Sequence, residues 1–317
     1  MKKCHITDIE NIKIGQIEDR EAVTGVTVIY SENGMTASAD IRGGAPGTRE
    51  TDLLRPENLV DKVHGVFLAG GSAYGLDVAT GIMNYLEEID IGFDTGVCKV
   101  PIVTGAILFD LNIGNPKIRP DANMGYQATK KASNTPIKEG NFGCGMGATL
   151  GKFMGDSYTM KSGIGSSSFK LGDLIVGSIV AVNPFGEVFD PNTGTTIAGA
   201  YDRKSQKLQS LEKAFSSIYS DPFSTNTTIG TIITNADISK ANAKKISEMA
   251  HSGISRTIRP SHTMVDGDSL FTLATNEVEA DINLIGHMAS KSVENAILQG
   301  VKTAESICNY PSYKDIW

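Results

Sequence analysis

The stretch STNTTIGTIITNAD, residues 224 to 237, marks the sharpest change of character in this 317-residue chain. From residue 202 to 226 the chain is polar, rich in Ser and Lys, and closed by a Pro and a Ser/Thr cluster, which is typical of an exposed connector. From Thr227 onward TTIGTIIT has the β-branched content of a buried strand. The stretch therefore predicts that Thr227 lies where a connector enters a sheet. Taken alone, such a Thr is far more often explained by β-propensity than by catalysis.

A threonine at such a junction can also carry chemistry. Its hydroxyl can attack the carbonyl carbon before it, and hydrolysis of the resulting ester leaves a free α-amine beside the same hydroxyl. Because the pKa of an α-amine lies near neutrality, this amine can act as the general base for its own residue, and no His is required. Thr227 is therefore a candidate nucleophile, with Asn226 on the other side of the bond that would break.

The rest of the chain alternates strand and helix patterns. Residues 63 to 69, VHGVFLA, predict a strand, and GGSAYG then leads into a helix in which Leu76, Ala79, Met83 and Leu86 recur at helical spacing. Further predicted elements are a strand over 174 to 182 that ends at Asn183, a helix over 238 to 251 with Asp237 or Ser239 as its cap and Gly253 as its stop, a strand over 269 to 275, and a helix over about 281 to 301. Strands that are apolar on both faces favour sheets covered by helices, so we expect a layered α/β architecture.

Charge and hydropathy exclude several classes of protein. The net charge is -7 and no Lys/Arg-rich block is present, which argues against nucleic acid or an anionic membrane surface as a partner. No apolar stretch is long enough for a signal peptide or a membrane span, so we expect a soluble, cytoplasmic protein. The length allows one large domain or two small ones.

The sequence contains no cofactor motif. The 4 cysteines and 5 histidines are scattered without zinc spacing, so we expect no metal site. GCGMGATLGK at 143 to 152 is not a phosphate loop, because Phe153 follows Lys152 where Ser or Thr should stand, and GGSAYG does not fit GxGxxG. Tight turns explain these glycines better. KSGIGSSS at 161 to 168 lacks GxSxG and is explained by turn chemistry.

Two acidic residues form the second candidate site. Asp266 and Asp268 in VDGDS lie two residues apart at the entry of a predicted strand, where the strand period would direct both carboxylates to one face. Without other support, an ordinary Asp-Gly turn explains them better.

Several blocks in the same order resemble one known family. They are IRGGAPGTRETDLL at 41 to 54, HGVFLAGGSAYGLDVATG at 64 to 81, RPDANMGY at 119 to 126, GCGMGATLGK, KSGIGSSS, VAVNPFGEVFDP at 180 to 191, NTTIGTIITNAD at 226 to 237 and RPSHTMVDGDSLFTLAT at 259 to 275. Together they resemble the L-aminopeptidase/D-amidase/esterase family, which includes β-aminopeptidases and 6-aminohexanoate-oligomer (nylon-oligomer) hydrolases. The resemblance implies a four-layer αββα sandwich of the N-terminal-nucleophile type. It also implies self-cleavage into residues 1–226 and 227–317, both remaining parts of one globular domain.

The resemblance also implies roles for individual residues. Thr227 matches the nucleophile, Asn226 the residue before the scissile bond, and Asn183 the amide that stabilises the oxyanion. The further matches are Asp266 and Asp268 beside the nucleophile's amine, Lys152 (with Lys161 as the alternative) as the site lysine, and Tyr126 with Asn123 in substrate binding. No cofactor is implied.

The expected substrate is a small molecule or a short peptide: a peptide, an amino-acid amide or an ω-amino-acid oligomer. We expect a homo-oligomer of cleaved heterodimers. Family aminopeptidases, by the resemblance, carry a Glu just before the site tyrosine. Here Asn123-Met124-Gly125 stands there, with Asp121 as the nearest acid, so recognition of a free amine is expected to be weak.

Two other functions stay open. An acyltransferase of the ornithine acetyltransferase type also cleaves itself and uses a Thr nucleophile, but it transfers the acyl group to an amine instead of water. A non-catalytic binding protein on the same scaffold would not be cleaved at all.

Overall fold

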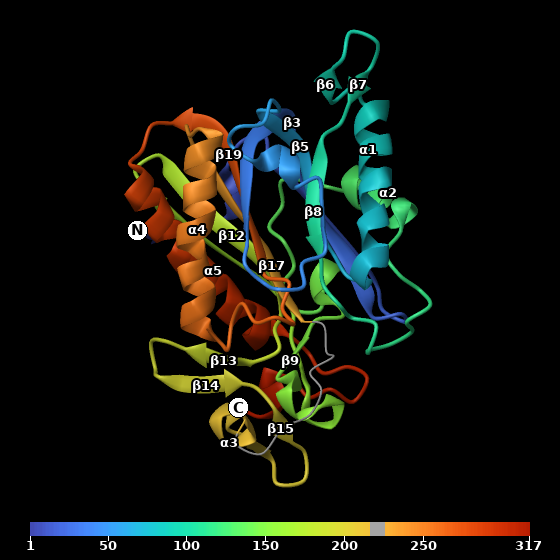
Figure 1. The fold of residues 1–317 in the computed structure, drawn as a ribbon, viewed down its shortest axis with the longest axis vertical. Helices are drawn as coiled ribbons and strands as arrows, with labels where there is room; N and C mark the ends of the chain where they lie inside the picture. The colour runs from blue at the N-terminus through green and yellow to red at the C-terminus, as the bar shows by residue number, and fades with distance from the viewer. Residues whose placement is uncertain (216–225) are drawn as a thin grey trace.

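The computed structural model describes residues 1–215 and 226–317, and its main strands form one sheet that is folded into two layers (Figure 1). The order of neighbouring strands is β1 (Lys2–Lys3), β11 (Ile164–Leu171), β12 (Leu174–Asn183), β17 (Thr227–Ala236), β19 (Ser269–Val278), β3 (Thr24–Ile41), β5 (Lys62–Ala69), β8 (Val103–Ile107) and β4 (Thr48–Arg49), and β2 (Lys13–Asp19) pairs with β3.

Strand β3, 18 residues long, belongs to both layers. Its first half pairs with β2 on one side and β5 on the other, whereas Thr36 to Ile41 pair with β19. The register with β5 shifts between Tyr30 and Met35, where the strand passes from one layer to the other. The layer of β11, β12, β17 and β19 is therefore continuous with the layer of β2, β5 and β8.

Helices cover the outer face of each layer (Figure 1). α1 (Val78–Glu88) and α2 (Ala122–Lys130) pack on β3 and β5, while α4 (Lys240–Thr257) and α5 (Ile282–Thr303) pack on the layer that contains β12 and β19. The predicted four-layer αββα sandwich is confirmed.

Side chains alternate between an inner core and two outer cores, as strands with both faces buried require. In β12, Ile175 and Ile179 lie in the core between the two layers, whereas Val176 and Val180 lie under α4 and α5. In β5, Leu68 faces the inner core and Phe67 lies under α1 and α2. The predicted strands over 63–69 and 174–182 are therefore confirmed as β5 and β12.

The two C-terminal helices begin where their caps predict. The Ser239 side chain accepts a hydrogen bond from the Asn242 N–H, and the Asp281 side chain accepts hydrogen bonds from the N–H groups of Asn283 and Leu284. Of the two caps considered for α4, Ser239 is therefore the one used.

The predicted end of α4 was wrong. Gly253 does not stop the helix, which continues to Thr257. A Cβ at Gly253 would lie 2.4 Å from the carbonyl oxygen of Ser290 and 3.0 Å from the nitrogen of Glu294, both in α5. This glycine therefore permits the close approach of two helices and has no capping function.

Smaller elements complete the chain. They are β6 (Phe93–Asp94) with β7 (Lys99–Val100), β9 (Thr149–Leu150) with β10 (Met160–Lys161), β13 (Glu187–Asp190) between β14 (Thr195–Ala198) and β18 (Ile258–Arg259), β15 (Tyr201–Asp202) with β16 (Lys207–Leu208), and α3 (Leu211–Phe215). The predicted connector over 202–226 thus contains short elements up to Phe215, and its part from 216 to 225 lies outside the described residues. None of the helices in the described ranges combines the length and apolarity needed to cross a membrane.

Candidate active site

Thr227 is the first residue of β17, in the centre of its layer. It lies opposite Asn183, the last residue of β12, in an antiparallel register. On the other side β17 runs parallel to β19, and an isolated bridge joins Asn226 to Asp266 in the same register. Thr227 is only 4% exposed, and its hydroxyl donates a hydrogen bond to the carbonyl oxygen of Asn226. The candidate nucleophile therefore contacts the peptide unit that self-cleavage would break.

Both acidic residues of VDGDS are buried beside this threonine. One carboxylate oxygen of Asp268 accepts the N–H of Thr228 at 2.8 Å. Asp266 accepts the N–H of Phe185 at 3.3 Å and both the N–H and the hydroxyl of Thr263. Burial, with a smaller contribution from the charge of Asp268, raises the pKa of Asp266. β19 begins only at Ser269, so both carboxylates belong to the turn that precedes the strand, and they are anchored by donors of this turn together with Thr228 and Phe185.

Asn183 and Lys152 form one hydrogen-bonded unit. The ammonium of Lys152 donates to the side-chain oxygen of Asn183 at 2.8 Å and to its carbonyl oxygen at 3.1 Å. The side-chain nitrogen of Asn183 donates to the carbonyl oxygen of Phe109 at 3.0 Å. Burial lowers the pKa of Lys152 to about 7, although the charge of Asp266 opposes this shift. Lys152, which contacts the strand partner of Thr227, is therefore close to its titration point at neutral pH.

The second lysine occupies a different environment. The ammonium of Lys161 donates to the carbonyl oxygens of Gly145, Ala148 and Ser162. Burial lowers the pKa of Lys161 to about 7 as well. Its partners are main-chain carbonyl oxygens and do not include Asn183, so on contacts Lys152 is the better candidate for the site lysine.

His262 was missed by the sequence reasoning. Its ring Nδ1 lies 2.8 Å from a carboxylate oxygen of Asp268, which also accepts the His262 N–H at 3.0 Å. The ring packs edge-on against His251, with centroids 4.9 Å apart, and burial lowers the pKa of His251 to about 4. The available signal was the position of His262 six residues before Asp268, but only the turn between them brings the two together.

The structure does not bring the predicted substrate-binding residues to Thr227. The Tyr126 hydroxyl donates to Glu88 at 2.6 Å, and its ring packs on Tyr85, in the pair of outer helices. Asn123 is exposed on α2, and Asp121 accepts the N–H of Met124 as the cap of that helix. The contacts of these side chains are thus within or next to the α1 and α2 layer.

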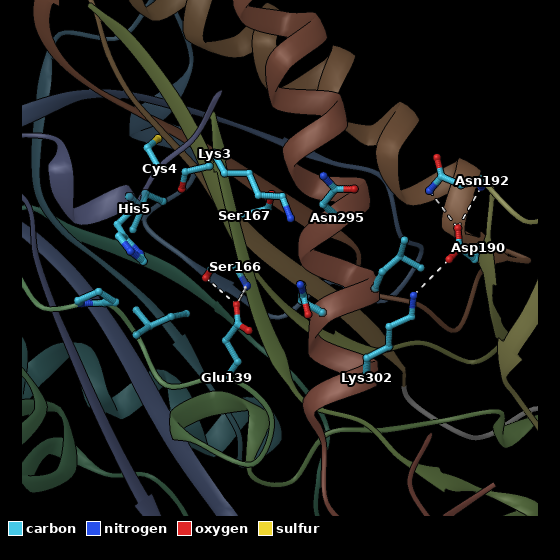
Figure 2. Close-up of a pocket in the computed structure, with 16 residues that line it drawn as sticks. Lys3, Cys4, His5, Glu139, Ser166, Ser167, Asp190, Asn192, Asn295 and Lys302 are labelled. Carbon is cyan, nitrogen blue, oxygen red and sulfur yellow. Dashed lines mark hydrogen bonds and ion pairs between the residues drawn. The ribbon is translucent and has the colours of Figure 1, made fainter. Parts of the chain in front are cut away.

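A cavity of about 390 Å³ lies elsewhere, between β11, α5 and the N-terminal residues (Figure 2). Its wall includes Lys3, Ser167, Asn295 and Lys302, and the Lys302 ammonium is paired with Asp190 at 3.2 Å. Thr227 and its partners do not line it. Within residues 1–215 and 226–317, no cluster of three or more His, Cys, Asp or Glu side chains could hold a metal ion.

The chain is similar to known proteins over nearly its whole length. Residues 5–312 match the model of peptidase family S58. An uncharacterized aminopeptidase of Mycobacterium bovis is 37% identical, over 98% of this chain and 97% of that protein. A 6-aminohexanoate-oligomer endohydrolase of Agromyces sp. is 29% identical, over 93% of this chain and 85% of that protein.

Solved structures show the same fold at low sequence identity. A β-aminopeptidase of Burkholderia sp. matches with a TM-score of 0.72 at 17% identity, over 97% of this chain and 89% of that one. The L-aminopeptidase D-Ala-esterase/amidase of Ochrobactrum anthropi, described as a variant of the Ntn hydrolase fold, matches with a TM-score of 0.70 at 17% identity, over 97% and 88% of the two chains. The family resemblance drawn from the sequence blocks is confirmed: the chain belongs to peptidase family S58 and is a hydrolase of amide bonds.

Proposed function

We propose that this hydrolase cleaves itself between Asn226 and Thr227 and then uses Thr227 as an N-terminal nucleophile. The observation that carries the proposal is the contact of the Thr227 hydroxyl with the Asn226 carbonyl at the entry of β17. The products are residues 1–226 and 227–317, which remain one globular domain because β17 and β19 of the second product pair with β12 and β3 of the first.

The released amine of Thr227 serves as the general base for its own hydroxyl, because the pKa of an α-amine lies near neutrality. When Oγ1 of Thr227 bonds to the carbonyl carbon of a substrate amide, the C–N bond breaks and the amine leaves with the proton taken from the hydroxyl. Water then hydrolyses the acyl-enzyme and restores the hydroxyl. Asn183, opposite Thr227, supplies its side-chain N–H to the oxyanion once that group leaves Phe109. Asp266 and Asp268 stabilise the ammonium form of the amine, and Lys152 holds the Asn183 side chain.

The proposed substrates are short peptides, amino-acid amides or ω-amino-acid oligomers. The names of the relatives, aminopeptidase and 6-aminohexanoate-oligomer endohydrolase, support this range. Within it we favour blocked or internal amides over free N-terminal amines. Asn123 is neutral, and the contacts of Asp121 lie at the start of α2 and not at Thr227, so neither residue places a charged anchor for an ammonium group beside the proposed nucleophile.

Transfer of the acyl group to an amine instead of water is the second candidate reaction. It shares the threonine nucleophile and differs in the acceptor alone. Adding hydroxylamine or a free amino acid during turnover, and measuring the ratio of transfer product to hydrolysis product by mass spectrometry, separates the two.

The central test is the intact mass of the purified protein. Cleavage gives fragments of 226 and 91 of the 317 residues, which apportions 33.7 kDa to about 24 and about 10 kDa. Thr227→Ala should remain a single chain, because no hydroxyl is left to form the ester. Thr228→Val is the matched control, since the neighbouring Thr228 is also buried and should be dispensable for processing. Normal processing of Thr227→Ala would remove Thr227 from its proposed role.

The assembly is a separate expectation. We propose a homo-oligomer of cleaved heterodimers, and light scattering of the processed protein at several concentrations would measure it. A mass that stays at that of one heterodimer would contradict this expectation.

A further inference from the structure

The scissile carbonyl already has a main-chain donor in the uncleaved chain. The N–H of Gly267 donates to the carbonyl oxygen of Asn226 at 2.8 Å. The N–H of Asn226 donates to Val265 at 2.9 Å, so the residue before the scissile bond is held on both sides of its backbone. The carbonyl that Thr227 would attack is therefore polarised and fixed before any reaction begins.

Only glycine fits at position 267. A Cβ there would lie 2.9 Å from Oγ1 of Thr227, 3.2 Å from its Cγ2 and 2.8 Å from the carbonyl oxygen of Ala45. Any side chain would thus press on the nucleophile. The glycine lets the backbone amide approach both the carbonyl and the threonine side chain.

The neighbours of Gly267 hold its amide in place. The carbonyl oxygen of Asp266 accepts the N–H of Ala45 at 2.8 Å, and that of Asp268 accepts the N–H of Arg42 at 2.9 Å. The carboxylates of both aspartates are anchored as well, in part by Thr263 and His262. Because this amide is already oriented toward the Asn226 oxygen, no free energy is needed to reorient it when negative charge develops on that oxygen.

In the uncleaved chain the Asn183 side chain makes hydrogen bonds with other groups. Its side-chain nitrogen donates to Phe109, and its side-chain oxygen accepts from the N–H of Thr149 at 2.9 Å and from Lys152 at 2.8 Å. In the uncleaved chain the Asn226 carbonyl accepts hydrogen bonds from the Gly267 amide and from the Thr227 hydroxyl, whereas the Asn183 side-chain nitrogen donates to Phe109.

We propose that the Gly267 N–H stabilises the oxyanion of self-cleavage, so that self-cleavage and substrate turnover use different oxyanion donors. This inference rests on the proposed function of Thr227. It assigns Gly267 to the first reaction and leaves Asn183 to the second.

Oγ1 of Thr227 bonds to the carbonyl carbon of Asn226, and the C=O electron pair moves onto the oxygen that faces Gly267. When C=O re-forms, the bond from that carbon to the Thr227 nitrogen breaks, and the nitrogen takes up the proton that the hydroxyl lost. Water then hydrolyses the ester, which leaves a carboxylate on Asn226 and restores the hydroxyl of Thr227. Gly267 donates a hydrogen bond throughout and transfers no proton.

The sharpest test replaces the N–H of Gly267 by an oxygen atom and adds no side chain. In cell-free translation, Gly267 is replaced by glycolic acid, which exchanges its N–H for an ester oxygen, and self-cleavage is followed by intact mass. The same exchange at Gly172, in the exposed turn between β11 and β12, is the control. Removing one oxyanion donor typically slows a reaction by about a hundred to a thousand-fold. A slowing of tenfold or more at 267, with the control unchanged, supports the proposal, and a smaller effect overturns it.

Asn183→Ala is the second arm and decides the matter if the ester variant does not fold. Its precursor should cleave within tenfold of the wild-type rate, while turnover of an amide substrate by the processed protein should fall by about a hundredfold or more. A precursor that keeps the wild-type melting temperature but stays uncleaved would overturn the assignment to Gly267. Processing of Thr227→Ala, in contrast, would refute the proposed function itself, so the two failures are distinguishable.

Discussion

Replacing Lys152 by methionine should change how the stability of the uncleaved chain responds to pH. Lys152 is 8% exposed, and burial lowers its pKa from 10.5 to about 7. Between these pH values the unfolded chain carries a proton at this site that the folded chain lacks, so the stability of the wild type rises with pH. The cost of burying the charge is fully present below pH 7 and disappears as pH rises toward 10.5.

The magnitude follows from the size of the shift. A difference of 3.5 units, 10.5 minus about 7, corresponds to a cost of about 5 kcal/mol at low pH, at about 1.4 kcal/mol per unit. Between pH 7 and pH 9 about 2 kcal/mol of this cost is relieved. Methionine has nearly the same length and no charge, so it removes this dependence. It also removes two hydrogen bonds to Asn183. Their loss adds a constant to the difference in free energy of unfolding between wild type and variant, and this constant does not depend on pH.

The assay is urea unfolding at pH 7, 8 and 9 in a Thr227→Ala background, so that every sample is one chain. The difference in free energy of unfolding, wild-type lysine minus methionine, should grow by about 2 kcal/mol over that range. Lys161→Met is the matched control, because the pKa of Lys161 is also lowered to about 7. If Lys161→Met shows the pH dependence and Lys152→Met does not, the reasoning about Lys152 is refuted.

Three further predictions concern packing, the Asp268 turn and substrate choice. Gly253→Ala should destabilise the protein by about 1–3 kcal/mol in urea unfolding, because a Cβ 2.4 Å from Ser290 forces α4 and α5 apart, and a neutral or stabilising effect would contradict this packing. His262→Ala should lower stability by about 1–3 kcal/mol because buried Asp268 loses a donor, and His262→Asn should recover part of the loss; equal effects of the two variants would argue against the hydrogen bond. In kcat/KM, a free-amine amino-acid p-nitroanilide should exceed its N-acetylated form by less than a hundredfold, and a larger preference, about 2.7 kcal/mol or more, would mean that an ammonium anchor exists.

The elements that frame the site could be predicted because each follows from a local pattern. The apolar runs that became β12 and β17 define their own lengths, so Asn183 at the end of one and Thr227 at the start of the other were placed at strand ends. Their direct pairing depends on an antiparallel register that no local pattern encodes. Their assignment to one site came from the family resemblance.

The remaining site features depend on turns and on packing between distant segments. Lys152 lies in the connection that follows β9, and Lys161 lies nine residues later in β10, so composition could not tell which one reaches Asn183. Gly267 looked like part of an ordinary Asp-Gly turn, and its contact with Asn226 exists only after β17 and β19 align. Gly253 was misjudged because the helix-stop rule describes one helix and takes no account of a second helix packed against it.

Strands β17 and β19 come from the last part of the chain, yet their outer partners, β12 and β3, come from the first part. For a chain broken ahead of β17, refolding from the denatured state requires two molecules to meet, so the recovered fraction should fall on dilution. At low concentration unfolding is then effectively irreversible. The lifetime of the folded molecule is set by the rate at which β17 separates from β12 and β19 separates from β3. Only the uninterrupted precursor folds in a first-order process, whose yield does not depend on dilution.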